Sequence, residues 1–253
     1  PGSPLERRAV RGVDLMLAEG EFATVIGSNG AGKSTLLAAI AGDVIPQKGR
    51  IRIGDRDVTR QAPAKRAARV ARVFQDPLAG SCADLSIEEN LALAAMRGSR
   101  RGIGLALRAD RRKLLRERVA ELGLDLESRM GDRMGLLSGG QRQALALVMA
   151  TLAGAEVLLL DEHTAALDPG MAEFVAELTQ RLVTAHRLTT LMVTHSMRQA
   201  LDLGSRTIML HEGRIVLDIS DEKRQSMTVD GLVDMFRRVR GGAELDDDSL
   251  RIG

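Results

Sequence analysis

Aromatic side chains are scarce in this sequence. It has no tryptophan and no tyrosine, and four of its 253 residues are phenylalanine. Proteins that hold single-stranded nucleic acid stack its bases on aromatic rings, so the shortage argues against that function. The formal net charge of +2 is too small to indicate a nucleic-acid surface, although the isoelectric point near 9.1 leaves the possibility open. We therefore expect no nucleic-acid partner.

Cysteine is almost absent, and a signal peptide is not visible. Cys82 is the only cysteine, which excludes an internal disulfide bond and suits a reducing compartment. Charged residues occupy positions 6–8, where the apolar stretch of a signal peptide should begin.

One stretch, residues 144–160, is apolar enough to suggest a membrane span. Gly154 and Glu156 interrupt it, and the charged pair Asp161 and Glu162 follows directly. A span needs about 20 apolar residues, so we interpret the stretch as a buried helix followed by a buried strand. Any membrane connection must then come through another chain.

Short apolar, β-branched runs alternate with helical patterns, which predicts an α/β fold. A helix is expected at residues 33–41, after a glycine-rich loop, and part of a hairpin at residues 50–53. A strand is also expected near Val13. The other predicted strands are residues 22–26, 69–74, 157–160, 190–193, 207–210 and 215–219.

The length allows one large domain, and its parts differ in pattern. The strand signals stop in residues 77–136, where arginine-rich helical sequence predicts a subdomain inserted into a core of residues 1–76 and 137–220. Residues 221–253 are expected to form a C-terminal helix and an acidic, solvated tail. We expect the basic residues of this insert to form a solvated helical face. A face that contacts anionic lipid headgroups is the less favoured alternative. They are Arg97, Arg100, Arg101, Arg108, Arg111 and Arg112.

Residues 27–35 match the phosphate-binding pattern GxxxxGK[ST]. Glycines let backbone N–H groups turn towards phosphate oxygens, and the following helix points its positive end at them. Lys33 can reach the β- and γ-phosphates, and Ser34 can offer a hydroxyl to Mg²⁺. A glycine-rich turn without a ligand is the weaker interpretation. The ATP-binding loop comprises Gly27, Ser28, Asn29, Gly30, Ala31, Gly32, Lys33, Ser34 and Thr35.

Two carboxylates follow the apolar residues 157–160. The end of such a buried strand delivers Asp161 towards the metal, as in other P-loop NTPases, and Glu162 is placed to polarise the attacking water. The alternative is a core strand that ends in two solvated carboxylates, which is the weaker interpretation beside a complete phosphate loop. Together the two motifs predict a P-loop NTPase and no more.

Further motifs narrow the class. Leu-Ser-Gly-Gly-Gln at residues 137–141 precedes a long helix, Gln75 follows a strand, Ala-Leu-Asp at residues 166–168 follows the carboxylates, and His195 comes after another strand. These match the signature motif, Q-loop, D-loop and switch histidine of the ABC ATPases. With the motifs in the family's order from Gly27 to His195, the chain resembles the ABC ATPase family.

The resemblance implies a mixed-sheet P-loop core, an antiparallel β portion and an inserted helical subdomain. In the family, two subunits pair head to tail, and each ATP lies between one phosphate loop and the partner's signature motif. The signature motif suits this role, because a hydroxyl, free N–H groups and the start of a helix together form an anion site. Without the partner subunit, the same residues would be an ordinary helix-capping loop. By resemblance, the residues that bind the partner's ATP are Ser138, Gly139, Gly140 and Gln141. The catalytic residues are Glu162, His195, Gln75 and Lys33. The Mg²⁺ residues are Ser34, Gln75 and Asp161. The D-loop residues at the dimer contact are Ala166, Leu167 and Asp168.

The implied reaction is hydrolysis of ATP to ADP and phosphate with Mg²⁺, which closes and reopens the dimer and moves a permease through a groove beside Gln75. We expect a homodimer or a pair of ABC subunits on the cytoplasmic face of the cell membrane. Integral-membrane permease subunits and a separate substrate-binding protein are the other expected partners. Residues 161–169 are similar to a subgroup of importers for amino acids or related small molecules. A soluble ABC-type ATPase in cofactor assembly, or in DNA or ribosome handling, is the alternative.

Two further expectations depart from the family pattern. ABC ATPases usually begin with a strand and an aromatic residue that stacks on adenine, but no aromatic precedes Phe22 here. We therefore expect that the first strand is missing, that adenine is held weakly and that the β portion has an unpaired edge. His163 stands where a proline is most familiar and is interpreted as a subfamily marker. His186 and His211 are expected at the surface or in turns.

Overall fold

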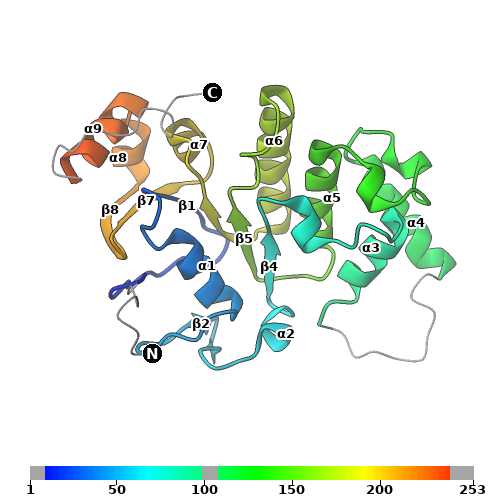
Figure 1. Cartoon of the computed structure of the whole chain (residues 1–253), viewed down its shortest axis with the longest axis horizontal. Coiled ribbons are helices and arrows are strands. Elements are labelled where there is room, and N and C mark those ends of the chain that lie inside the picture. The colour runs from blue at the N-terminus through cyan, green and yellow to red at the C-terminus, as the bar shows by residue number, and fades with distance from the viewer. Residues whose placement is uncertain (1–8, 99–107, 240–253) are drawn as a thin grey trace.

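The computed structural model describes residues 9–98 and 108–239, and a six-stranded sheet lies at its centre (Figure 1). Across the sheet the order is β4 (Val70–Val73), β5 (Val157–Asp161), β6 (Thr189–Val193), β1 (Phe22–Ile26), β7 (Arg206–His211) and β8 (Arg214–Ser220). Strands β4, β5, β6, β1 and β7 are parallel, and β8 pairs antiparallel with β7. This mixed sheet confirms the predicted fold class. Each of these strands was predicted, with ends that shift by at most one residue.

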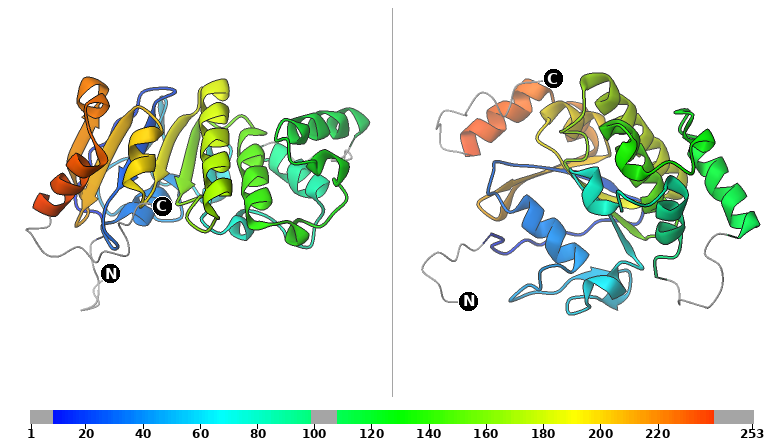
Figure 2. Two further views of the ribbon diagram at one scale, coloured as in Figure 1. Left: turned by 90° about the horizontal axis from the view of Figure 1, so that it is seen from above. Right: turned by 45° about the vertical axis from the view of Figure 1, so that its right-hand side comes forward.

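Helices cover both faces of the sheet, so its strands are apolar on both sides (Figure 2). α1 (Lys33–Ala41) packs on the face that carries Leu159. α5 (Gly139–Thr151) and α6 (Pro169–His186) pack on the opposite face, which carries Leu158 and Leu160. α1 has the predicted bounds. β5 ends at Asp161 and Glu162 follows it, so both carboxylates lie at the carboxyl end of this strand.

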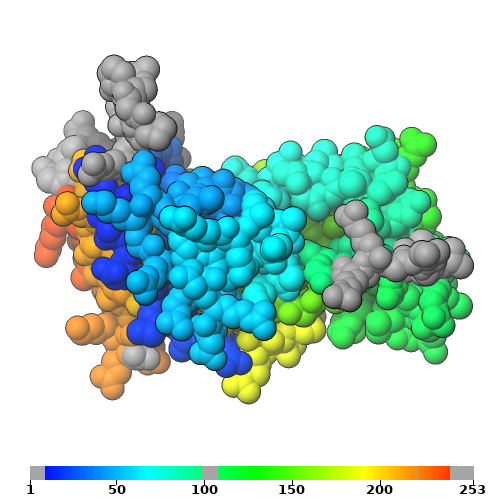
Figure 3. Space-filling view, turned by 90° about the horizontal axis from the view of Figure 1, so that it is seen from below, coloured from blue at the N-terminus to red at the C-terminus, as the bar shows by residue number. Residues whose placement is uncertain are grey.

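The smaller β portion is a two-stranded antiparallel hairpin of β2 (Arg52–Ile53) and β3 (Arg56–Asp57), followed by α2 (Pro63–Arg66). The predicted hairpin at residues 50–53 is therefore present. Seen from below, this segment forms the middle of one face of the molecule, and the helices α3 (Ile87–Ala95) and α4 (Ala109–Ala120) form its right-hand side (Figure 3).

The described residues between 77 and 136 contain α3 and α4 together with three short 3₁₀ helices, and no strand longer than a single bridge. α3 begins with a capping box between Ser86 and Glu89. The 3₁₀ helices are η1 (Pro77–Gly80), η2 (Leu126–Ser128) and η3 (Met134–Leu136). These elements gather beside α5 at one end of the molecule (Figure 1).

The prediction of one solvated basic face is wrong for Arg97. Its Nη2 donates a hydrogen bond to the backbone oxygen of Ala150 at 2.8 Å, and burial lowers the pKa of its guanidinium. Arg112 lies 3.0 Å from Glu88 in an ion pair, and Arg108 is exposed. Arg100 and Arg101 lie outside the described residues.

The C-terminal part forms two helices where one was expected, α8 (Asp221–Gln225) and α9 (Val229–Val239). α9 packs Leu232 and Phe236 on α7 (Met197–Asp202). The predicted acidic tail falls outside the described residues. Among the helices of residues 9–98 and 108–239, none is long and apolar enough to cross a membrane.

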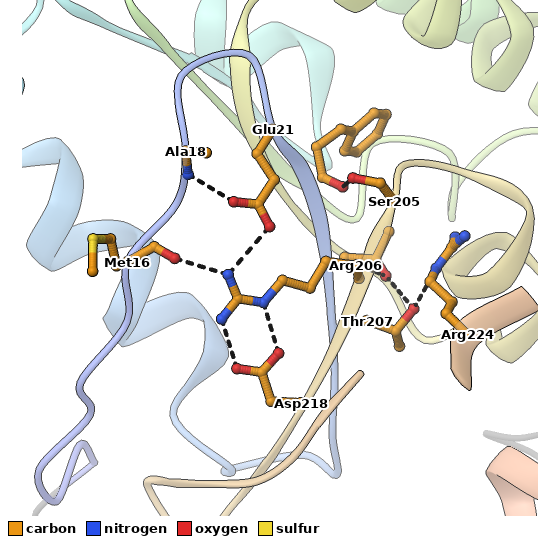
Figure 4. A network of polar contacts seen from close by, with 10 residues as sticks. Met16, Ala18, Glu21, Ser205, Arg206, Thr207, Asp218 and Arg224 are labelled. Carbon is orange, nitrogen blue, oxygen red and sulfur yellow. Dashed lines mark hydrogen bonds and ion pairs between the residues drawn. The ribbon is translucent and has the colours of Figure 1, made fainter. Parts of the chain in front are cut away.

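The strand predicted near Val13 does not form. Residues 12–18 alternate between exposed and partly buried positions, as an extended chain would, but pair with no strand. Side chains hold this segment in place. Arg206 donates to the backbone oxygen of Met16 at 2.8 Å, and Glu21 accepts from the N–H of Ala18 at 2.7 Å (Figure 4). These contacts satisfy backbone groups that a strand would have paired.

Candidate nucleotide-binding site

Most of the residues predicted to act on ATP follow the carboxyl ends of neighbouring parallel strands. The phosphate loop follows β1, and Gln75 lies shortly after β4. Asp161 ends β5, Glu162 comes next, and His195 lies shortly after β6. These four strands are consecutive in the sheet. Ligands of open α/β sheets bind at this edge, so the topology brings together residues that are far apart in the sequence.

The phosphate loop requires glycine at specific positions. Gly27, Gly30 and Gly32 have φ values of 153°, 77° and 103°, a region that favours glycine. A Cβ atom on Gly27 would overlap the carbonyl oxygen of Leu210, and one on Gly32 would overlap that of Ala9. No side chain caps the start of α1, so the first N–H groups of this helix point towards the loop as an anion site would require.

Lys33 is buried within this loop, with 5% of its surface exposed. Its Nζ donates hydrogen bonds to the carbonyl oxygens of Gly27 at 2.6 Å and Ser28 at 3.2 Å. Burial lowers the pKa of Lys33, and the nearby charges of Glu162 and Asp161 oppose that shift. A cation in this position needs a stronger anionic partner than backbone carbonyls, and a phosphate would supply one.

Glu162 and His195 form a close pair. Nε2 of His195 lies 2.6 Å from Oε1 of Glu162. The hydrogen bond from His195 lowers the pKa of Glu162, burial opposes the shift, and the charges of His195 and Lys33 add to it. Glu162 also has a left-handed backbone, with φ of 50°, which costs energy for a residue with a side chain. Such strain is typical of a residue held for a function.

Asp161 has a partner that the sequence did not suggest. Nη2 of Arg72, in the middle of β4, lies 2.7 Å from Oδ2 of Asp161. The sequence did offer a signal for this ion pair, because Arg72 is a charged residue inside a buried strand. Charged residues are rarely buried without a partner. The sequence-based prediction that Asp161 faces a metal ion had named no cationic side chain beside it.

The signature residues 138–141 begin α5. The hydroxyl of Ser138 accepts from the N–H of Gln141 at 3.2 Å, and the Gln141 side chain accepts from the N–H of Ser138 at 3.1 Å. In this single chain the motif is thus a capping box. A Cβ atom on Gly140 would overlap the side chain of Met171, so this glycine also allows α5 to approach α6. Within the described residues, no hydrogen bond or ion pair joins residues 138–141 to residues 27–35.

The D-loop residues 166–168 lead into α6. Oδ1 of Asp168 accepts from the N–H of Met171 at 3.1 Å and so caps that helix. From Glu162 and His195, an open groove of about 1320 Å³ runs between α6 and α7. Leu167 lies on the groove wall, so the predicted D-loop and the Glu162–His195 pair border the same surface.

His163, next to Glu162, is fully buried. Its Nε2 lies 2.9 Å from Oγ1 of Thr179, and Thr179 donates its own proton to the carbonyl oxygen of Val175 at 2.7 Å. His163 must therefore be the donor to Thr179. Burial lowers the pKa of His163 to about 4, which keeps the ring neutral. This residue faces α6 and the core, not the groove. His186 is exposed at the end of α6, and His211 is partly buried at the end of β7.

A second cavity, of about 340 Å³, adjoins the Q-loop. It lies between β4, η1, α3 and α5, and Phe74, Pro77, Leu93 and Arg97 are among its lining residues. Cys82 also lines it. Leu93 is 55% exposed, so the mouth of this cavity offers apolar surface.

Comparison with known proteins agrees with this geometry. The profile of a family described as ABC transporter matches residues 10–165. The chain belongs to the ABC transporter family. It is 44% identical over 225 residues to the tyrosine transport ATP-binding protein of Clostridioides difficile, which covers 88% of this chain and 89% of that protein. It is 36% identical to the thiamine import ATP-binding protein ThiQ of Yersinia pestis over 81% of this chain and 82% of that one.

Solved structures give the same result. A dimeric ATP-binding cassette in a post-hydrolysis state, bound to ADP and Pi, superposes with a TM-score of 0.74 at 27% identity, covering 87% of this chain and 94% of that one. This ABC protein is therefore an ATP-binding, ATP-hydrolysing subunit of a transport system.

Proposed function

We propose that this ABC ATPase drives an importer for an amino acid or a related small molecule. The observation that carries the ATPase chemistry is the Glu162–His195 pair beside the buried Lys33 at one sheet edge. The direction and the substrate class rest on the relatives, which include proteins described as tyrosine transport and thiamine import ATP-binding proteins.

In this proposal the phosphate loop binds ATP through its backbone N–H groups, and Lys33 exchanges its loop carbonyls for the β- and γ-phosphates. The other loop residues, from Gly27 to Thr35, shape this anion site. Glu162, kept ionised by His195, accepts a proton from the attacking water. His195 orients the carboxylate and can donate a hydrogen bond near the γ-phosphate. Gln75 contributes from the neighbouring strand end.

The residues present suit Mg²⁺. In the part of the chain that the structure describes, no group of three or more His, Cys, Asp and Glu side chains could hold a metal ion. Mg²⁺ in ATPases needs fewer, because substrate phosphates and water complete its shell. Ser34, Asp161 and Gln75 are the side chains that would hold it. Bound there, Mg²⁺ would supply positive charge against the charge that develops on the phosphates.

We further propose a head-to-tail homodimer, or a pair with a related ABC subunit. The Ser138 hydroxyl caps only its own helix here. Together with the first N–H groups of that helix, it has the chemistry of an anion site that the partner's nucleotide could complete. The D-loop residues Ala166, Leu167 and Asp168 would contact the partner. Residues 77–136 would form the helical subdomain that carries the signature motif towards the other subunit's phosphate loop.

Mixed subunits test the shared site. A dimer of one Lys33→Ala and one Ser138→Arg subunit retains one intact site, made from the second subunit's loop and the first subunit's signature motif. ATP turnover should therefore reappear on mixing two inactive variants. Ser128→Arg, a change at another exposed serine, is the control and should stay active as a homodimer. Full activity of the Ser138→Arg homodimer would contradict the shared site.

The cavity beside Gln75 is the proposed contact for integral-membrane permease subunits, which would place the protein at the cytoplasmic face of the membrane. A substrate-binding protein would complete the importer. Leu93→Glu, at the mouth of the cavity, should abolish co-purification with the permease. Leu114→Glu is the matched control, because Leu114 is 51% exposed on α4. Recovery of ribosomes or assembly proteins in place of a permease would favour the soluble alternative.

A further inference from the structure

Arg72 is a charged residue in the interior of the sheet. It is the third residue of β4, between the buried residues Ala71 and Val73, and its side chain is 17% exposed. A cation with so little access to water requires a partner. The structure gives it two carboxylates and an aromatic ring.

The two carboxylates come from different elements. Nη2 of Arg72 lies 2.7 Å from Oδ2 of Asp161 at the end of β5, and Nη1 lies 3.0 Å from Oδ2 of Asp43, which follows α1. The two nitrogens of one planar guanidinium are thus held by two fixed acceptors. Arg72 connects the carboxylate proposed to hold Mg²⁺ with the far end of the helix that starts at Lys33.

The guanidinium also lies 4.5 Å from the centre of the Phe74 ring, which favours a cation over the ring face. Phe74 and Arg72 both line the cavity beside Gln75. The side chain that touches Asp161 therefore has its other side towards the cavity proposed to receive the permease.

We propose that Arg72 is a positioning residue for the metal site. It fixes the Asp161 carboxylate by one oxygen, so the other can face Mg²⁺, and it balances the charge of Asp161 when no nucleotide is bound. A neighbouring cation weakens the attraction of a carboxylate for other cations. The site therefore binds a divalent metal poorly until phosphates add their charge. This inference rests on the proposed metal role of Asp161.

The chain contains a matched pair for comparison. Arg69 and Glu156 precede the same two strands, and Nη1 of Arg69 lies 2.6 and 2.9 Å from the two carboxylate oxygens. This ion pair joins β4 to β5 at the opposite end, away from the nucleotide. Arg69→Met removes an arginine–carboxylate contact between these strands without touching the metal site.

The experiment measures Mn²⁺ binding to the nucleotide-free protein by electron paramagnetic resonance, together with steady-state ATP hydrolysis. Arg72→Met should bind Mn²⁺ alone about tenfold more tightly than the unaltered protein, at the lower end of the effect of a neighbouring charge. Its kcat should fall about tenfold with KM for ATP nearly unchanged, because a misplaced group affects the reaction more than binding. Arg69→Met should match the unaltered protein in both measurements.

Arg72→Lys is the conservative variant. It keeps the charge, so Mn²⁺ affinity should return to that of the unaltered protein, but a lysine cannot span Asp161 and Asp43 as the guanidinium does, so kcat should remain low. Thermal melting establishes that each variant is folded. An Arg72→Met variant that matches Arg69→Met in both Mn²⁺ affinity and kcat would overturn the inference.

Asp161→Asn separates this inference from the proposed site. Loss of Mn²⁺ binding and hydrolysis in that variant supports the metal role of Asp161 whatever Arg72 does. If Asp161→Asn instead hydrolyses ATP normally with Mg²⁺, the proposed metal site is wrong, and the role of Arg72 is wrong with it.

Discussion

The two ends of the parallel strands hold their charges in different ways. At the amino ends, Arg69 pairs with Glu156, and Arg206 pairs with Asp218 at 2.6 and 2.7 Å and with Glu21 at 3.2 Å. The hydrogen bonds that Arg206 donates to Asp218 and to Glu21 raise the pKa of its guanidinium. The cations Arg69 and Arg206 thus have carboxylate partners within the chain, as Figure 4 shows for Arg206.

At the carboxyl ends one such ion pair is present, between Arg72 and Asp161, but other contacts are of a kind that a substrate could replace. Lys33 is bound by loop carbonyls, Ser138 by its own helix, and Glu162 by a histidine. A phosphate is a better partner for an ammonium group than a carbonyl is. From this comparison we expect the sheet to use its amino ends for cohesion and its carboxyl ends for binding.

The strongest test of this contrast compares two glutamates that flank β5. Glu162→Gln should keep ATP binding and slow hydrolysis by about 10²-fold or more, because the general base is lost, and it should trap an ATP-bound dimer. Glu156→Gln, at the other end of the strand, should hydrolyse ATP normally. Turnover assays and size-exclusion chromatography with ATP measure both. Normal turnover of Glu162→Gln in the presence of its permease would remove Glu162 from the mechanism.

The next effect concerns the buried histidine behind Glu162. The pKa of His163 is about 4 in the folded chain against an ordinary value of 6.5, so between these values the unfolded chain binds a proton that the folded chain does not. Stability is therefore lost as the pH falls through this window and levels off below it. The loss should reach about 2 kcal/mol at pH 5.

Urea unfolding at pH 7 and pH 5 measures this loss. His163→Gln lacks the titrating ring, so its free energy of unfolding should fall about 2 kcal/mol less than that of the unaltered protein over the same interval. An equal pH dependence in both proteins would show that His163 is not the group responsible.

A smaller effect is expected at His195. Removing it takes away the hydrogen bond that lowers the pKa of Glu162, so His195→Ala should lose about tenfold in turnover while binding ATP, the scale of a hydrogen bond to a charged group. The acidic limb of its pH–rate profile should shift to higher pH. His186→Ala, at an exposed histidine, is the control. A loss of fold stability with turnover per folded molecule unchanged would make His195 a core residue only.

The smallest effect is expected from a substitution at the amino ends of the strands. Asp218→Asn should weaken the Arg206 pair and cost about 0.5 to 1 kcal/mol of stability, as expected for a partly exposed ion pair. ATP turnover per folded molecule should not change, because no atom of this pair reaches the carboxyl edge. A tenfold loss of turnover in Asp218→Asn would contradict the separation of cohesion at the amino ends from ATP chemistry at the carboxyl ends.

Much of the fold and of the candidate site could be predicted from local patterns. The order of strands and helices, the bounds of α1 and the residues of the phosphate loop follow from periodicity and from spacing within a few positions. The prediction of a strand near Val13 was wrong because side chains, and not another strand, bind the backbone of that segment. The single C-terminal helix was wrong because the chain divides between Gln225 and Val229. The prediction that Arg97 lies on a solvated face was wrong because its side chain binds a backbone carbonyl 53 positions away.

By itself, the sequence determined which residues have the chemistry for phosphate binding and hydrolysis, because motif spacing places them after strands. The tertiary structure decided which of them meet. Arg72 lies 89 positions from Asp161, and the contact depends on β4 lying beside β5 in register. Glu162 and His195 meet because β5 and β6 are neighbours. No local pattern encodes these contacts, because sheet order and register arise only when the helices have buried both faces of the sheet.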